Sequence, residues 1–176
     1  MKRNKKSFIV LAMMLIALFV IPYSVKAWYT YTIVLQDWDL VDSGKHLDYT
    51  NKSKYTSYIN QGINTWESYK SGIIRQDTAA IINDVTFSDV SSLGTDAAGN
   101  AIVGQTRGIG TIKFATSFMD TFSNAQKLNV VIHEIGHALR LDHRNESDSI
   151  MYPSVTNITT LSIGDQRNYD SAYNEY

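Results

Sequence analysis

The chain has 176 residues, no cysteine and a nearly balanced charge, with 16 Lys and Arg residues against 17 Asp and Glu residues. Its length fits a single domain of ordinary size after removal of a leader. The absence of cysteine excludes disulfides, a cysteine nucleophile and thiolate metal ligands, so the fold must be stabilised by packing and by any bound metal.

The first 27 residues have the layout of a secretory signal peptide. Four basic residues among the first six precede an apolar run of 14 residues from Phe8 to Ile21, and Val25-Lys26-Ala27 then offers small residues at the positions that a signal peptidase reads. We therefore expect cleavage after Ala27 and export of one domain, residues 28–176. An uncleaved membrane anchor is the alternative, but a bilayer needs about 20 apolar residues.

Removal of the leader would make the rest of the chain acidic. Five basic residues and no acidic residue lie in the first 27 positions, so 11 basic and 17 acidic residues remain, a net charge near −6. Nucleic acids and anionic membrane surfaces are bound by basic faces. We therefore expect neither a nucleic acid nor an anionic membrane surface as a partner, and no membrane anchoring after cleavage. We also expect the protein to be a monomer.

The apolar and turn-forming residues predict alternating strands and helices along the domain. In chain order we expect a strand at 28–36, a polar turn at 37–45, a short extended piece at 46–49, a helix ending near Tyr69, a strand at 79–90, an irregular loop at 91–110, a half-buried or edge strand at 110–116, a helix from Ser123 and a closing helix at 162–173. Asn51 or Ser53 is expected to cap the first helix and Ser123 the second. This order predicts an α+β fold, with α/β-like character and a mixed twisted sheet.

Three of the four histidines fall within eleven residues, at the end of the second helix and just after it. His133 and His137 are four residues apart, so one helical turn places their imidazoles on the same side, where both can bind one zinc ion. The helix must end near residue 140 for His143 to reach that metal. Three histidines and a water would complete a tetrahedral catalytic site, whereas surface histidines without a metal are the alternative.

Glu134 follows the first histidine, about 100° around the helix. At this position its carboxylate borders the open coordination site without being a ligand. We expect Glu134 to act as general base on zinc-bound water, which attacks a peptide carbonyl, and then to pass the proton to the leaving amine.

Three segments resemble one known group of zinc peptidases. Residues 133–143 resemble the metzincin signature His-Glu-x-x-His-x-x-Gly-x-x-His. Residues 149–153 (Ser-Ile-Met-Tyr-Pro) are similar to the Met-turn that follows this signature, with the Met-Tyr-Pro of the matrixin branch, and residues 161–165 look like the start of the matrixin closing helix. The resemblance covers roughly residues 50–175 and is most specific at 130–165.

The resemblance implies a metzincin catalytic domain with an active-site helix, a Met-turn and a C-terminal helix, in a bacterial matrixin-family zinc endopeptidase that acts on protein or peptide substrates. Its one catalytic zinc would be held by His133, His137 and His143, with Glu134 as the base. The activity expected is therefore hydrolysis of peptide bonds outside the cell.

The same likeness assigns supporting roles to the residues after the histidines. Met151 would form an apolar floor beneath the three imidazoles, and Tyr152 and Pro153 would complete the Met-turn. Tyr152 is not expected to bind the metal, because the families with a metal-contacting tyrosine place it where this chain has Pro153. Asp165 would cap the closing helix or tie it to the Met-turn.

Two features depart from the matrixin pattern. Arg140 stands where the family has Gly, at a turn with positive φ, where an L-residue costs about 1–2 kcal/mol. Because zinc binding contributes on the order of 10 kcal/mol, we predict that Arg140 adopts a left-handed turn and that His143 still binds. Lys113 and Ala115 replace the ligands of the family's structural zinc, so we expect only the catalytic zinc ion. Whether the loop at 91–110 binds calcium is left open by the sequence.

An active endopeptidase is the main prediction. A catalytically impaired zinc-binding relative, acting as a secreted binding protein, is the alternative, and Arg140 is the feature that favours it. A peptidase selective for one partner substrate is a third reading. Cleavage preference depends on the loop after Pro153 and on residues around 104–118.

Overall fold

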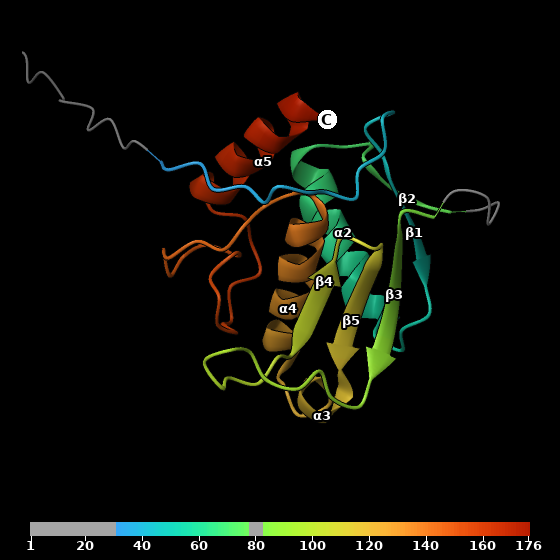
Figure 1. The fold of residues 1–176 in the computed structure, drawn as a ribbon, viewed down its shortest axis with the longest axis vertical. Coiled ribbons are helices and arrows are strands. Elements are labelled where there is room, and N and C mark those ends of the chain that lie inside the picture. The colour runs from blue at the N-terminus through green and yellow to red at the C-terminus, as the bar shows by residue number, and fades with distance from the viewer. Residues whose placement is uncertain (1–30, 78–82) are drawn as a thin grey trace, which may run out of the picture. The chain divides into compact units, whose positions relative to one another are not determined.

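The computed structural model describes residues 31–77 and 83–176, and five strands in this part of the chain form one sheet. The described elements are β1 (Leu47–Asn51), α2 (Thr56–Tyr69), β2 (Ile74–Gln76), β3 (Val85–Val90), β4 (Gly104–Arg107), β5 (Thr111–Ala115), α3 (Thr116–Met119), α4 (Asn124–Ala138) and α5 (Ile163–Glu175). The sheet order is β2-β1-β3-β5-β4, in which β4 alone runs antiparallel, at one edge (Figure 1). The predicted mixed sheet is confirmed, whereas the predicted leader lies outside the described residues.

Alternate residues of the parallel strands supply the core beneath the helices. A strand places every second side chain on the same face, and the buried face here consists of Leu47, Tyr49, Val85, Phe87, Ile112 and Phe114. The Phe87 ring stacks on Phe114 at 6.4 Å between centroids and meets Tyr49 edge-on at 5.7 Å. The alternation predicted for 110–116 is therefore that of a half-buried strand, and β4 takes the edge.

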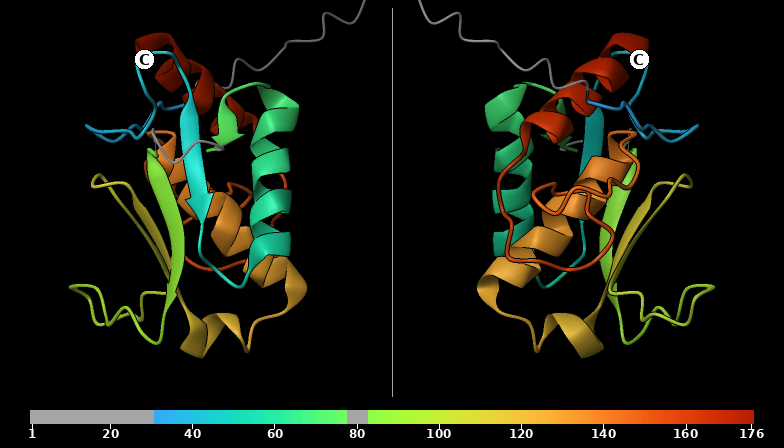
Figure 2. Two further views of the ribbon diagram at one scale, coloured as in Figure 1. Left: turned by 90° about the vertical axis from the view of Figure 1, so that its right-hand side faces the viewer. Right: turned by 90° about the vertical axis from the view of Figure 1, so that its left-hand side faces the viewer.

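Helices α2 and α4 pack against each other on one face of the sheet (Figure 2). Helix α2 buries Ile59, Ile63 and Trp66, which lie on one face because of their helical spacing. The Trp66 indole Nε1 donates a hydrogen bond to the Ile132 carbonyl of α4 at 3.0 Å. This bond fixes α4 one residue before His133, so the apolar face of α2 positions the histidine helix. No helix in the described ranges is long and apolar enough to cross a membrane.

Helix α4 begins as predicted. The Ser123 hydroxyl accepts a hydrogen bond from the Gln126 backbone N–H at 3.2 Å, and the Gln126 side chain accepts one from the Ser123 N–H at 3.0 Å. This reciprocal pair is a capping box. The predicted caps of α2 are wrong, because Tyr55 occupies the cap position without a side-chain bond. Asn51 and Ser53 instead bond the backbone of the turn before it.

Several strand boundaries differ from the prediction. Residues 31–36 of the predicted first strand make only one isolated bridge, between Leu35 and Leu141. This segment runs alongside the turn after α4 and does not join the sheet. Strand β4 lies within the predicted loop, because its polar sequence has no apolar alternation and it is extended only by pairing with β5. Strand β2 has three residues, too few for a periodic signal. The strand predicted at 79–90 begins at Val85, and residues 79–82 lie outside the described part.

Candidate metal centre

Helix α4 carries the first two histidines and ends just after them, where the chain reverses. Arg140 has a φ of 76°, so the predicted left-handed turn is confirmed. Its backbone N–H donates to the His137 carbonyl at 3.0 Å, and such bonds close helix ends at a left-handed residue. The turn directs the following residues back along α4 and thereby returns His143 to the other two histidines.

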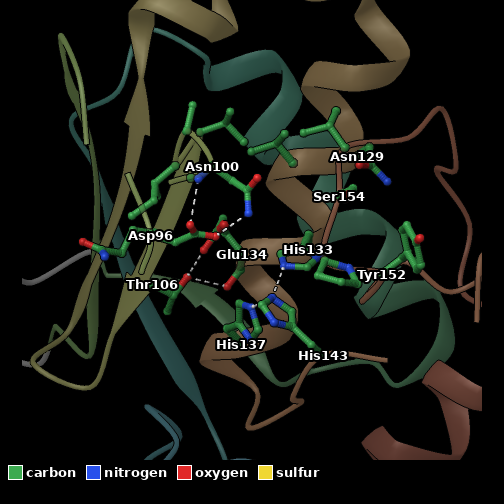
Figure 3. A pocket seen from close by; sticks show the side chains of 18 of the residues that line it. Asp96, Asn100, Thr106, Asn129, His133, Glu134, His137, His143, Tyr152 and Ser154 are labelled. Atoms are coloured by element: carbon green, nitrogen blue, oxygen red, sulfur yellow. Dashed lines mark hydrogen bonds between the residues drawn. The ribbon is translucent and has the colours of Figure 1, made fainter. Parts of the chain in front are cut away.

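The three imidazoles converge on one point at the side of α4 (Figure 3). The Nε2 atom of His143 lies 3.2 Å from Nε2 of His133 and 3.3 Å from Nε2 of His137. Tetrahedral zinc with Zn–N bonds of about 2.0–2.1 Å requires nitrogens about 3.3–3.4 Å apart. The separations therefore match those of a shared zinc ion.

The Nδ1 atoms of His133 and His137 show that the Nε2 atoms of these two rings, which face the shared point, carry lone pairs. Nδ1 of His133 lies 2.9 Å from the Ile150 carbonyl and Nδ1 of His137 lies 2.8 Å from the Leu141 carbonyl. A carbonyl only accepts, so each Nδ1 holds the proton and each Nε2 is free to bind a metal. Burial lowers the pKa of His133 to about 3 and that of His137 to about 4, so both rings are neutral at neutral pH. Converging lone pairs of this kind fit a divalent cation.

Gln36, from the other end of the domain, contacts the second histidine, and no sequence pattern indicated it. Its side-chain amide nitrogen lies 3.1 Å from Nδ1 of His137 but makes no hydrogen bond there, because the proton on Nδ1 is directed to the Leu141 carbonyl. Its backbone N–H donates to the Arg140 carbonyl at 2.8 Å, and the Arg140 Nε donates to the Gln36 carbonyl at 3.1 Å. The segment at 31–40 therefore braces the turn that presents His143.

Glu134 is buried beside the histidines and does not belong to the converging group. Its carboxylate lines the cleft, and Thr106 on β4 donates to Oε2 at 2.7 Å. Burial raises the pKa of Glu134 to about 7, although the bond from Thr106 opposes that shift. The carboxyl group can therefore both lose and regain a proton near neutral pH.

The Met-turn lies directly against α4. A β-carbon on Gly136 would overlap the sulfur of Met151, so this sulfur touches the helix backbone between the two histidines. The Met151 carbonyl accepts from the Arg144 backbone N–H at 2.9 Å. Tyr152 and Pro153 follow, and both line the cleft.

Asp165 links the start of α5 to the residues before Met151. Its buried carboxylate accepts from the Ser149 hydroxyl, from the Ile150 backbone N–H at 3.0 Å and from the Ser162 backbone N–H at 2.8 Å. The carbonyl of the same Ile150 receives the Nδ1 proton of His133. Asp165 thus reaches a metal ligand through a single intervening residue.

The cleft around the histidines has a volume of about 620 Å³. Strand β4 forms one wall, the loop after Met151 forms the other, and α4 forms the floor (Figure 3). Asn129 of α4 holds the second wall, because its side chain bonds the Thr156 backbone N–H at 3.0 Å and the Ile158 carbonyl at 2.8 Å. Both walls lie in the segments expected to set cleavage preference, although the sequence did not indicate Asn129.

The remaining polar residues have local roles. The Asp142 carboxylate accepts from the His143 backbone N–H at 2.7 Å and has no bond to the ring. In the loop at 91–110, Asp96 accepts from two backbone N–H groups of its own turn. The second group of metal-capable side chains found in the described residues is Asp42, Asp48 and Asp84, and there Arg75 binds both oxygens of Asp48. Neither group of metal-capable side chains found in the described residues includes a residue of 91–110.

Solved structures share this fold at low sequence identity. Archaemetzincin from Methanopyrus kandleri matches with a TM-score of 0.55 and 13% identity, over 76% of this chain and 99% of that one. A chain of the GM1-bound ECX AB5 holotoxin matches with a TM-score of 0.53 and 16% identity, over 80% of this chain and 86% of that one. These likenesses show a metzincin-like fold, and within it the histidine triad is a group that can hold a metal ion.

The family follows from the sequence comparison. A family model described as Matrixin matches residues 38–174, and the chain belongs to the matrixin family of zinc metalloendopeptidases. No curated protein sequence matches it. The predicted zinc cofactor is confirmed by this membership together with the triad of His133, His137 and His143.

Arg140 permits a test of the strained turn. Arg140→Gly and Arg140→Ala both remove the bonds to Glu175 and Gln36, but only Gly adopts a φ of 76° without strain. We expect Arg140→Gly to be more stable than Arg140→Ala by about 1 kcal/mol, as measured by urea unfolding of the metal-free protein. Equal stability of the two variants would show that the turn relaxes when the arginine is removed.

Proposed function

We propose that Glu134 is the general base of this peptidase and promotes attack of water on a peptide carbonyl. The observation that carries the proposal is the place of its carboxylate, which is buried in the cleft next to His133 yet outside the metal-binding triad. A zinc ion held by the three histidines supplies a Lewis acid that polarises the carbonyl and acidifies water. With a pKa raised to about 7, Glu134 can accept a proton from water and deliver it to the leaving amine.

The other acidic and basic groups of the cleft are less suited to this role. The Nδ1 protons of His133 and His137 are committed to backbone carbonyls. Asp96 and Asp142 are the other carboxylates among the described lining residues, and both are exposed and bonded to backbone N–H groups. Glu134 is therefore the best placed of these groups to move a proton.

A peptide substrate suits the shape of the site. Strand β4 lines the cleft and stands at the edge of the sheet. Unpaired backbone groups of an edge strand can bind an extended peptide as an added strand. A peptide bound in this way would cross the cleft beside Glu134 and the three histidines.

The proposal is tested on the purified protein by zinc analysis together with hydrolysis of casein and of a peptide library. We expect one zinc per chain, internal cleavage of peptides, loss of cleavage with a zinc chelator and its return when zinc is restored. One bound zinc without cleavage of any substrate would contradict the proposal and favour a zinc-binding relative. Cleavage of one library sequence without casein hydrolysis would identify a selective peptidase.

We also propose that the enzyme acts outside the cell. The support is the basic and apolar composition of residues 1–27, with small residues before position 28. Amino-terminal sequencing of protein recovered from the medium tests this proposal. A first residue of Trp28 is expected, whereas protein retained in the membrane with its leader would contradict it.

A further inference from the structure

One side chain of the edge strand is bonded directly to the Glu134 carboxylate. The Thr106 hydroxyl lies 2.7 Å from Oε2 of Glu134 and 2.8 Å from the backbone carbonyl of the same residue. Within 31–77 and 83–176, Thr106 is the one side chain with a hydrogen bond to this carboxylate. The half-buried Thr106 therefore joins β4 to the proposed base.

A second residue of the same strand touches the same carboxylate. A β-carbon on Gly104 would lie 2.5 Å from Oε1 and 2.8 Å from Cγ of Glu134. Atoms cannot approach so closely, so the Glu134 side chain uses the space that the glycine leaves open. Residues 104 and 106 face the same side of the strand, because side chains alternate along it.

These contacts restrict a side chain that is otherwise flexible. A glutamate rotates about three bonds, and fixing such a side chain costs up to about 2 kcal/mol of conformational entropy. The Thr106 bond holds one oxygen and the Gly104 backbone lies against the other. Oε1 has no hydrogen bond from the described residues, and the Glu134 side chain lines the cleft, where the attacking water would lie.

We propose that Thr106 is a positioning residue, whose hydroxyl fixes Oε2 of Glu134 while Gly104 leaves the space that directs Oε1 into the cleft. This inference rests on the proposed role of Glu134. A positioned base reacts without first losing rotational freedom, and a displacement of about 1 Å can lower a rate about 100-fold. Thr106 would therefore act on the rate of the chemical step and not on the binding of substrate or zinc.

The main test compares Thr106→Val with Thr106→Ser in zinc-loaded protein. Valine keeps the shape and removes the hydroxyl, and we expect it to lower kcat about 10–100-fold with a KM changed less than about threefold. Serine retains the hydroxyl and is expected to restore most of kcat. Thr86→Val is the matched control, since Thr86 lies on β3 outside the cleft and, among the described residues, its hydroxyl bonds only the Asn83 side chain.

Two further variants separate positioning from a general weakening of the fold. Gly104→Ala is expected to lower kcat because its methyl group would displace the Glu134 carboxylate. In a Glu134→Gln background, Thr106→Val is expected to reduce the remaining activity less than about twofold, because the two changes act on one step. An equal loss in both backgrounds would show that Thr106 acts independently of Glu134 and would overturn the inference.

A readout independent of activity is the crystal structure of the zinc-loaded Thr106→Val protein. We expect the Glu134 carboxylate to leave its wild-type position while the three histidines keep theirs. If the wild type cleaves peptides and Thr106→Val has a normal kcat with an unmoved carboxylate, the inference is wrong. If the wild type cleaves no peptide, the proposed function fails, and the position of the carboxylate still decides whether Thr106 holds it.

Discussion

Replacing Glu134 by glutamine is expected to lower kcat for peptide hydrolysis about 10²–10⁴-fold, the usual contribution of a general base. Glutamine has the shape of glutamate and can still bond Thr106, so the walls of the cleft should stay in place. Its amide cannot take up a proton from water. Because the carboxylate is outside the triad, the zinc content should remain one per chain.

The measurement is kcat and KM on a cleaved peptide, with zinc determined in the same samples. Glu146→Gln is the matched control. Glu146 is half-exposed, and the amide oxygen of the introduced glutamine can still accept a hydrogen bond from Arg144. This control should leave kcat unchanged. A Glu134→Gln protein with full kcat would exclude Glu134 as the base, and one that has lost its zinc would give Glu134 a part in holding the metal.

Replacing Asp165 by alanine is expected to destabilise the protein by about 3–5 kcal/mol, the largest loss of stability among our predictions. The fully buried carboxylate accepts from two backbone N–H groups, those of Ile150 and Ser162, and from two hydroxyls. Each buried N–H left without a partner costs about 1–3 kcal/mol. Loss of the capping box at Ser162 adds about 1 kcal/mol.

Thermal and urea unfolding of the metal-free protein measure this loss, and Asp170→Ala is the control on the same helix. Asp170 bonds Tyr69 and Lys70 at the surface, so its removal should cost less than about 1 kcal/mol. Zinc affinity should also fall in Asp165→Ala, because Ile150 bonds both Asp165 and His133. A stability of Asp165→Ala within about 1 kcal/mol of the wild type would contradict the prediction.

The two helices around the site could be predicted because their signals are local. Ser123 and Ser162 begin α4 and α5 with side chains that bond residues only three positions away. Such signals depend on nearby residues alone, so they can be recognised in the sequence without the tertiary structure. The left-handed turn at Arg140 was expected for another reason, because the matrixin family has Gly at this position, and it is observed at φ 76°.

Strand β4 forms one wall of the cleft within a segment expected to do so, but its strand structure could not be predicted. Its four residues, Gly-Gln-Thr-Arg, have no apolar alternation and lie within a segment rich in turn-forming residues. The strand exists because β5 pairs with it, and β5 is itself placed by the buried faces of Ile112 and Phe114. Strand structure of this kind is decided by partners distant in the sequence.

The sequence by itself determined the zinc ligands and the position of Glu134 relative to them, because helical spacing and one turn relate residues at most ten positions apart. The tertiary structure decided what surrounds them. Gln36, Gly104 and Thr106 are 28 or more residues from the side chains that they contact, and only the packing of the sheet and the amino-terminal segment against α4 brings them together. Contacts over such separations follow from how whole elements bury their apolar faces, for which a local pattern carries no signal.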